Sequence, residues 1–363
     1  LRDQARVRDA WLGNRLDTIL PRLMRREKID LWVLSAREYN EDPVVETMLP
    51  ATWLAARRRT ILVFHDPGDG QPLEKLAVSR YSPGPWYEQA WDPEANTDQW
   101  IRVAELIAKK NPARIGINRS SAFPLADGLT ASEEDALLAA LNQRDRDRVV
   151  SAEKLALGWL ETRSAAEMTI YPQIVRMAHS IIAEGLSERV ITPGVTTTAD
   201  VAWWYRERIR SAGLDTWFHP GVSLQRPCEP VAPGAARYEG EPESPVIEPG
   251  DFLHVDFGIT YLGLNTDTQH HAYVLKPGES EAPRGLREGI SAGNRVQDIL
   301  MSQFRTGISG NDVKDTTRLA VAEVGLDASI YSHPIGYHGH AAGPAIGMWD
   351  DQDSRPPTGE HRI

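Results

Sequence analysis

The chain has 363 residues, of which 41% are hydrophobic and 25% charged, and a net charge of −11 from 51 acidic and 40 basic side chains. At roughly 150 residues per domain this length predicts two domains, and the composition is that of a globular protein. No apolar run approaches the roughly 20 residues of a membrane span, and an acidic chain repels a phosphate backbone. We therefore expect a soluble protein whose partners are neither a membrane nor nucleic acid.

The single cysteine, Cys228, excludes an intramolecular disulfide and a cysteine-rich zinc module. Any metal ligands must therefore be His, Asp or Glu side chains. The sequence opens with Leu1 and a charged stretch, without the apolar segment of a signal peptide. Composition does not distinguish between two locations, the cytoplasm and an exported location that is reached after removal of a leader.

Helix and strand patterns alternate through the first 150 residues. Apolar side chains at helical spacing predict helices over 15–28, 98–110 and 132–141, the last with Ser132 as its N-cap. Short buried strands are predicted over 30–35, 59–65, 76–81, 114–118 and 149–150. This alternation indicates an α/β domain, and the change of pattern after the charged run 142–148 places its boundary near residue 155. The predicted domains are thus 1–155 and 156–363.

The second half is richer in helices. Helices are predicted over 165–189 and 198–212, and Pro172 should kink the first or mark its true start. The Pro- and Gly-rich stretch 219–250 is expected to be loop. Two further helices are predicted over 281–304 and 310–324.

A carboxylate-bearing hairpin is the most informative motif. Strands are predicted over 252–257 and 266–275, with Gly258 and Gly263 at the bends. A hairpin centred between Tyr261 and Leu262 would place Asp256 directly opposite Asp267, with both side chains on one face. Facing like charges need a proton, a basic neighbour or a cation, and a divalent metal answers the charge best. The alternative is a bulge at Gly258 that turns both acids toward solvent.

Other histidines lie on the same strands. His254 shares a face with Asp256, and His270 and His271 point to opposite faces, because the strand period is two. We interpret all three as hydrogen-bonding strand residues outside the metal site.

A histidine-rich loop follows the last two predicted helices. His333, His338 and His340 fall within eight residues, among glycines and small side chains that let the backbone approach a ligand closely. Neutral imidazole is the commonest protein metal ligand, although a glycine-rich turn with hydrogen-bonded histidines is the alternative. The joint occurrence of this loop and the carboxylate hairpin favours a metal site.

These residues resemble the M24 metallopeptidases, the pita-bread fold of methionine aminopeptidase, Xaa-Pro aminopeptidase, prolidase and creatinase. The resemblance rests on the Gly250-Asp251 turn, the Asp256-Phe257-Gly258 strand, Asp267 eleven residues after Asp256, and the His-x-x-Gly sequence at His340. Arg163 and Glu167 also resemble the entry pattern of the first helix in the prolidase and aminopeptidase P branch. The resemblance implies an α/β N-terminal domain followed by an α+β pita-bread catalytic domain.

The resemblance also implies chemistry. It suggests two divalent ions, Mn²⁺, Co²⁺ or Zn²⁺, bridged by Asp256 and Asp267, with His340 as the imidazole ligand and His338 as its alternative. A metal-bridged hydroxide would then hydrolyse the peptide bond before a proline at the second position of a peptide substrate. His219 is the nearest upstream candidate for the substrate-assisting histidine of the family, and family analogy implies a dimer or tetramer.

Three departures from the family pattern define an alternative. Only 23 residues follow His340, and Glu360 is their only glutamate, whereas the family uses two glutamate ligands on later strands. The pita-bread domain is therefore expected to lack its C-terminal strands here, and the chain to continue beyond Ile363. The Asp-x-Thr-Arg pattern appears as Asp267-Thr-Gln-His, and no His-Tyr pair precedes the Gly-Asp turn. The alternative is a metal-free pita-bread protein, either a creatinase-like C–N hydrolase or a binding module.

Overall fold

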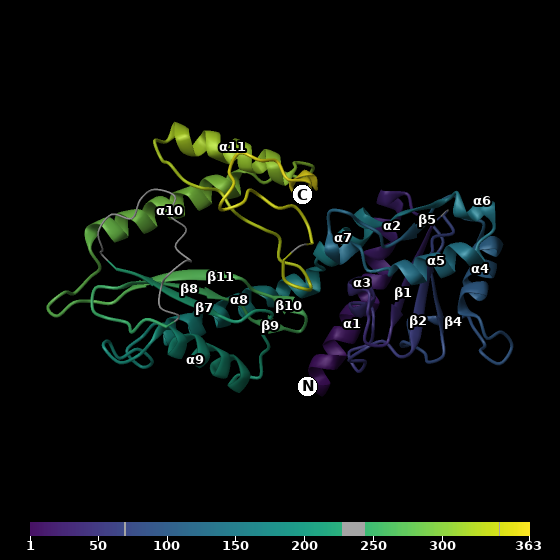
Figure 1. The fold of residues 1–363 in the computed structure, drawn as a ribbon, viewed down its shortest axis with the longest axis horizontal. Helices are drawn as coiled ribbons and strands as arrows, with labels where there is room; N and C mark the ends of the chain where they lie inside the picture. Colours follow the sequence, from purple (N-terminus) through teal and green to yellow (C-terminus); the bar gives the residue numbers. More distant parts are fainter. Residues whose placement is uncertain (69, 227–243, 341) are drawn as a thin grey trace.

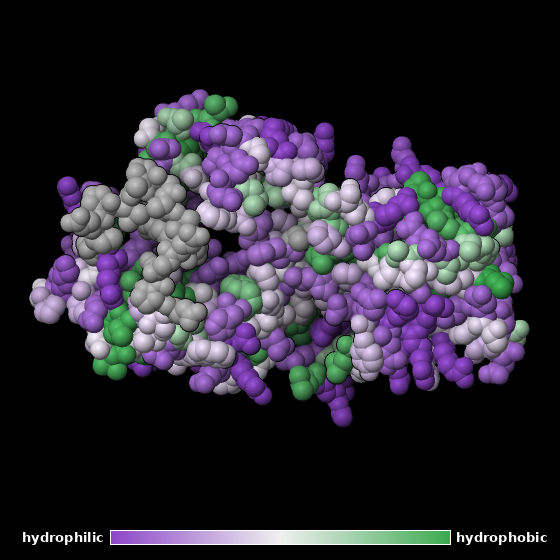
Figure 2. Space-filling view, in the orientation of Figure 1, coloured by the Kyte–Doolittle hydropathy of each residue, from purple (hydrophilic) through white to green (hydrophobic). Residues whose placement is uncertain are grey.

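The computed structural model describes residues 1–68, 70–226, 244–340 and 342–363. They form two bodies, the N-terminal one on the right of Figure 1 and the second on the left. Hydrophilic surface predominates on the face of the N-terminal body seen in Figure 2, in keeping with the charged composition. Cys228 and much of the Pro-rich stretch lie outside the described residues.

A six-stranded mixed sheet forms the N-terminal body, with strand order β4-β3-β2-β1-β5-β6. The strands are β1 (Leu31–Arg37), β2 (Arg59–His65), β3 (Glu74–Ser79), β4 (Glu88–Gln89), β5 (Ile115–Ile117) and β6 (Val149–Ser151). β1 pairs antiparallel with β2 and parallel with β5. The α/β domain expected from the alternating pattern is confirmed.

Helices cover both faces of this sheet, because both faces are apolar. Trp32 and Leu34 of β1 pack on one side, and Leu31 and Val33 on the other. The first side is covered by α1 (Arg2–Thr18), α2 (Leu20–Glu27), α3 (Pro43–Glu46) and α7 (Glu153–Glu161), and the second by α4 (Gln99–Lys110) and α5 (Ala131–Ala140). The short α6 (Gln143–Arg146) and a 3-10 turn, η1 (Pro124–Ala126), complete the body.

Two local predictions in this body are wrong. The helix expected over 15–28 is two helices, and α1 begins already at Arg2. The break at Ile19 comes two residues before Pro21, which has no N–H to continue the helical hydrogen bonds. Ser132 is not the N-cap of α5, because that helix begins at Ala131 and Thr130 occupies the cap position.

The second body carries a three-stranded antiparallel sheet of order β11-β8-β7. Its strands are β7 (Gly221–Gln225), β8 (Phe252–Phe257) and β11 (Thr268–Tyr273), and a two-residue pair, β9 (Thr260–Tyr261) and β10 (Leu264–Asn265), lies at the hairpin tip. α8 (Ala165–Gly185) and α9 (Thr198–Ser211) pack on one face through an apolar core. β7 lies inside the stretch expected to be loop, and among the described residues it pairs with β8 alone.

α8 begins at Ala165 rather than at Pro172. Ser164 and Glu167 form a capping box there, which fixes the start of the helix seven residues before the proline. The opposite side of the sheet faces a separate layer of two helices, α10 (Arg284–Gln303) and α11 (Gly310–Glu323), and Figure 1 shows this layer above the sheet. Figure 2 shows an opening between the two layers. After α11 comes the histidine loop, and a 3-10 turn, η2 (Pro357–Glu360), follows near the end.

Buried polar contacts join the two bodies. Arg15 of α1 forms an ion pair of 3.1 Å with Glu167 of α8, and both side chains are less than one-tenth exposed. Arg15 also donates hydrogen bonds to the carbonyls of Trp159 and Thr162. The boundary near residue 155 remains a prediction; α7 packs into the N-terminal core, which favours a position a few residues later. Within the described ranges, no helix is long and apolar enough to cross a membrane.

Candidate metal centre

The two hairpin aspartates share a face of the sheet, but they do not pair directly. Asp256 pairs with Gln269, and the same register places Asp267 opposite Gly258. The turn is centred between Leu262 and Gly263, both of which have positive φ, so every partner lies two residues from its expected position. The predicted direct pairing is therefore wrong. Since a shift of two preserves the strand period, both carboxylates still project to one side.

The proximity of these carboxylates appears in their electrostatics. Burial and the negative charge of Asp267 raise the pKa of Asp256 to about 6. One oxygen of Asp256, Oδ1, is buried without a hydrogen-bond partner. A buried carboxylate oxygen without a donor is costly, and a cation bound between the two acids would satisfy it.

The histidine loop is a narrow hairpin that reaches the same place. Backbone bridges join Ser332 to Ile346 and Gly336 to Gly339. His333 therefore lies on the first arm of this hairpin, and His340 lies on the second. Asn265, just before the second aspartate, donates from Nδ2 to the carbonyls of Gly336 and Tyr337 at 2.9 Å. These two hydrogen bonds hold the histidine loop against the carboxylate hairpin.

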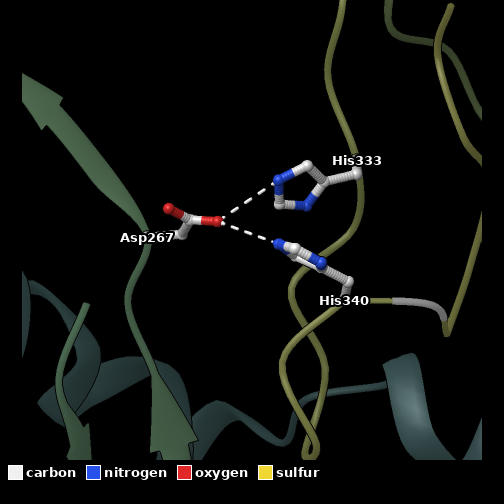
Figure 3. Close-up of side chains that lie close together, drawn as sticks. All are labelled: Asp267, His333 and His340. Carbon is white, nitrogen blue, oxygen red and sulfur yellow. Dashed lines mark ion pairs between the residues drawn. The ribbon is translucent and has the colours of Figure 1, made fainter. Parts of the chain in front are cut away.

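Asp267, His333 and His340 form the cluster that fits an ion. The Nε2 atoms of His333 and His340 lie 3.2 and 3.5 Å from Oδ2 of Asp267. Figure 3 shows both rings directed at that single oxygen. Nitrogen and oxygen ligands about 2.1 Å from a tetrahedral ion lie roughly 3.4 Å apart, so the two distances from the carboxylate oxygen to the imidazoles are those of neighbouring ligands of one metal ion. The donor set of carboxylate and imidazole suits Zn²⁺, Co²⁺ or Mn²⁺.

The two imidazoles respond differently to the acids. Burial disfavours the charged form of His333, but its hydrogen bond to Asp267 and the two negative charges nearby raise its pKa overall. Burial and the neighbouring His333 lower the pKa of His340. The nearby acids therefore favour the protonated form of His333, whereas at His340 burial and the neighbouring imidazole outweigh the effect of Asp267.

His333 is the residue that the sequence analysis did not assign. The signal was present, because His333-Pro-Ile-Gly336 has the same His-x-x-Gly spacing that drew attention to His340. The alternative ligand His338 lies apart from this cluster. It lies at the tip of the loop, where its Nε2 is 2.8 Å from the carbonyl oxygen of Pro43 in the N-terminal body.

The other candidates lie apart from the cluster. His219 is exposed and packs against Trp203, with ring centroids 5.0 Å apart. It precedes β7, whose Gly221 pairs with Asp256, and its catalytic role stays a prediction. Glu360 accepts a hydrogen bond of 2.7 Å from Asn311 on α11.

Trp217 is a further neighbour that no sequence pattern indicated. Its Nε1 donates to the carbonyl of Thr266 at 2.9 Å, and its ring meets that of His340 edge to face at 4.6 Å. Gly339 has a φ of +85° and a Cβ there would lie 2.3 Å from this ring, so only glycine permits the approach. Trp217 therefore sets the position of His340.

A two-body α/β and pita-bread architecture with carboxylates and imidazoles converging between its sheet and a histidine loop is typical of a metallohydrolase. The sequence profile of metallopeptidase family M24 matches residues 173–358, just over half of the chain. The chain therefore belongs to metallopeptidase family M24. No curated protein matches it.

Solved structures share this fold across most of their length. The X-Pro aminopeptidase from Thermotoga maritima MSB8 superposes with a TM-score of 0.62 at 16% identity, covering 93% of this chain and 88% of that one. The dipeptidase PepE from Mycobacterium ulcerans gives 0.59 at 18%, covering 94% and 85%. The prolidase from Pyrococcus horikoshii OT3 gives 0.55 at 16%, covering 93% and 86%. At these identities the likeness shows the fold alone, and it confirms the predicted fold class.

Proposed function

We propose that this chain is a metal-dependent peptidase that hydrolyses the bond between an N-terminal residue and a following proline. The convergence of Asp267, His333 and His340 beside Asp256 is the observation that supports it most strongly. Membership of family M24 and the fold shared with an X-Pro aminopeptidase and a prolidase point to the same substrate class.

Asp267, His333 and His340 would hold the ion, with Asp256 as the second carboxylate. A divalent ion bound there supplies Lewis acidity, which lowers the pKa of water and polarises a carbonyl. We propose two such ions, Mn²⁺, Co²⁺ or Zn²⁺, with Asp256 and Asp267 between them. His219 is kept as a proposed proton-transfer group, and a dimer or tetramer as the proposed assembly.

The residues themselves have clear parts in this proposal. One oxygen of Asp267 lies near the Nε2 atoms of both rings, so the three donor atoms converge on the place that the ion would occupy. Trp217 shields His340 from one side, and burial of Asp256 removes water from its unpartnered oxygen. Exclusion of water strengthens every charge interaction within the site.

Metal content and hydrolysis of Xaa-Pro substrates test this proposal together. Purified protein reconstituted with Mn²⁺, Co²⁺ or Zn²⁺ should hold about two ions per chain and release the first residue of Ala-Pro and of Ala-Pro-Ala, with Ala-Ala as the control substrate. Metal-loaded protein that cleaves none of these peptides would refute the proposal.

A metal-free pita-bread protein is the alternative, either a creatinase-like C–N hydrolase or a binding module. It is favoured by one observation: in the part of the chain that the structure describes, the three-donor cluster contains no glutamate. Absence of bound metal after reconstitution, in folded protein, would support this alternative over the first.

A further inference from the structure

A second pair of imidazoles lies on the other face of the sheet. His270 of β11 and His179 of α8 approach until Nε2 of the first and Nδ1 of the second are 2.8 Å apart. Their ring centroids are 4.8 Å apart and their planes are nearly perpendicular, at 82°. His270 occupies the last position of the Asp-Thr-Gln-His stretch, where the related pattern has arginine.

This pair is separate from the carboxylate site. His270 pairs with Val255, which is fully buried against α8 and α9, whereas the neighbouring Asp256 projects to the opposite side. β11 is an edge strand of its sheet, so one flank of the pair is open. His179 is exposed and His270 is half-buried, and both rings are therefore accessible to an ion from solvent.

The charge state of the pair suits metal binding. Burial and the neighbouring His179 lower the pKa of His270, so this ring is neutral at neutral pH. Neutral imidazole is the form that coordinates metals. The proton that now bridges the two nitrogens can move to the outer nitrogen of its own ring, which leaves both inner lone pairs free.

The nitrogen separation is compatible with a metal that binds its ligands at right angles. Two nitrogens about 2.0 Å from an ion and at right angles to each other lie roughly 2.8 Å apart, whereas a tetrahedral pair lies roughly 3.3 Å apart. The observed 2.8 Å matches the right-angle arrangement, which Cu²⁺ and Ni²⁺ prefer. A turn of the exposed His179 ring brings both lone pairs to one point.

We propose that His179 and His270 form a second metal site, which takes Cu²⁺ or Ni²⁺ through two imidazole nitrogens and water. The bound ion joins α8 to β11 three residues from Asp267 and so stabilises the strand that directly follows this acid. The site does not depend on peptidase activity.

Copper binding to the triple variant Asp267→Ala, His333→Ala, His340→Ala tests the proposal, because that background removes the three donors of the candidate metal centre. Electron paramagnetic resonance should show one Cu²⁺ with two nitrogen ligands. His179→Ala and His270→Ala should each weaken binding of this ion on the order of 100-fold, because chelation by two fixed groups is lost. His179→Gln keeps a hydrogen-bonding side chain and should weaken it equally. The matched control is His271→Ala, which lies next to His270 on the opposite face and should bind copper unchanged.

The opposite pattern would overturn the proposal. Copper affinity and spectrum that remain unchanged in His179→Ala or in His270→Ala show that the pair is only a hydrogen bond between a helix and a strand. Equal loss in His271→Ala places the copper on the other face.

Discussion

His333 approaches Asp267 to 3.2 Å although the two helices α10 and α11 separate these residues in the sequence. His340 approaches the same oxygen of Asp267 at 3.5 Å. Because His338 instead contacts the N-terminal body, the loop divides its histidines between two tasks. Two of them serve the candidate metal centre, and one holds the tip of the loop.

These positions predict how single substitutions of the loop histidines change the affinity for a divalent metal. His333→Ala and His340→Ala should each weaken divalent metal binding at least about 100-fold, because even groups one step removed from a metal typically contribute 10- to 100-fold. His338→Ala should leave metal affinity unchanged. Isothermal titration with Mn²⁺ or Zn²⁺ measures all three, and a loss confined to His338→Ala would contradict the assignment.

Asp267→Ala should abolish metal binding at the candidate metal centre and Xaa-Pro hydrolysis while the N-terminal domain stays folded, since it removes a ligand and no core volume. The pKa of Asp256 should also fall toward its ordinary value, because the charge that helps to raise it is gone. Carbon-detected NMR titration of the metal-free protein measures this fall. Near-normal turnover in the variant would refute the role of the hairpin.

The buried pair of Arg15 and Glu167 should contribute strongly to stability. Glu167→Gln keeps the capping acceptor of α8 but leaves the guanidinium without its counter-charge, and removal of one partner of a buried pair costs about 3 to 5 kcal/mol. We expect about 3 kcal/mol, the lower end of that range, because two carbonyls still accept from Arg15. Urea unfolding of Glu167→Gln and of the unchanged chain measures this loss in the free energy of unfolding.

Asp3→Asn is the control for that experiment. It disrupts the pair between Arg6 and Asp3, whose side chains are 72% and 91% exposed, and should leave the midpoint unchanged. An equal loss of stability in both variants would show that burial does not determine the contribution of these pairs.

We expect the ionisation of Asp42 to make the stability of the N-terminal body depend on pH. Its side chain accepts from the amides of Val44 and Val45 and from Asn118, yet complete burial raises its pKa to about 6. Because the folded pKa exceeds the unfolded one, this group stabilises the fold below pH 4, and the contribution is lost as the pH rises through 6.

Comparison of Asp42→Asn with the unchanged chain isolates that contribution. The variant cannot ionise, so the difference between the two unfolding free energies should change between pH 4 and 6 and be constant above pH 7. At neutral pH it should be less stable by about 1 to 3 kcal/mol, because its amide faces the donor of Asn118. A pH-independent difference would show that Asp42 does not titrate in the folded state.

Local signals in the sequence predict several elements correctly, together with the residues of the hairpin. The bounds of β2 and β8 match the predicted 59–65 and 252–257, because alternation and flanking turn residues are local signals. The shared face of Asp256 and Asp267 follows from a period of two, and it is unaffected by the misplaced turn.

The position of the hairpin turn and the identity of the histidines near Asp267 depend on tertiary contacts. The turn at Leu262 and Gly263 depends on a backbone conformation that leucine rarely adopts, and its neighbour Tyr337 comes from the histidine loop. The choice of His333 and His340 over His338 depends on where a narrow loop crosses from the sheet to α3. Contacts between residues far apart in the chain leave no periodic signal, and so spacing indicated the types of the candidate ligands while packing decides which of them come together.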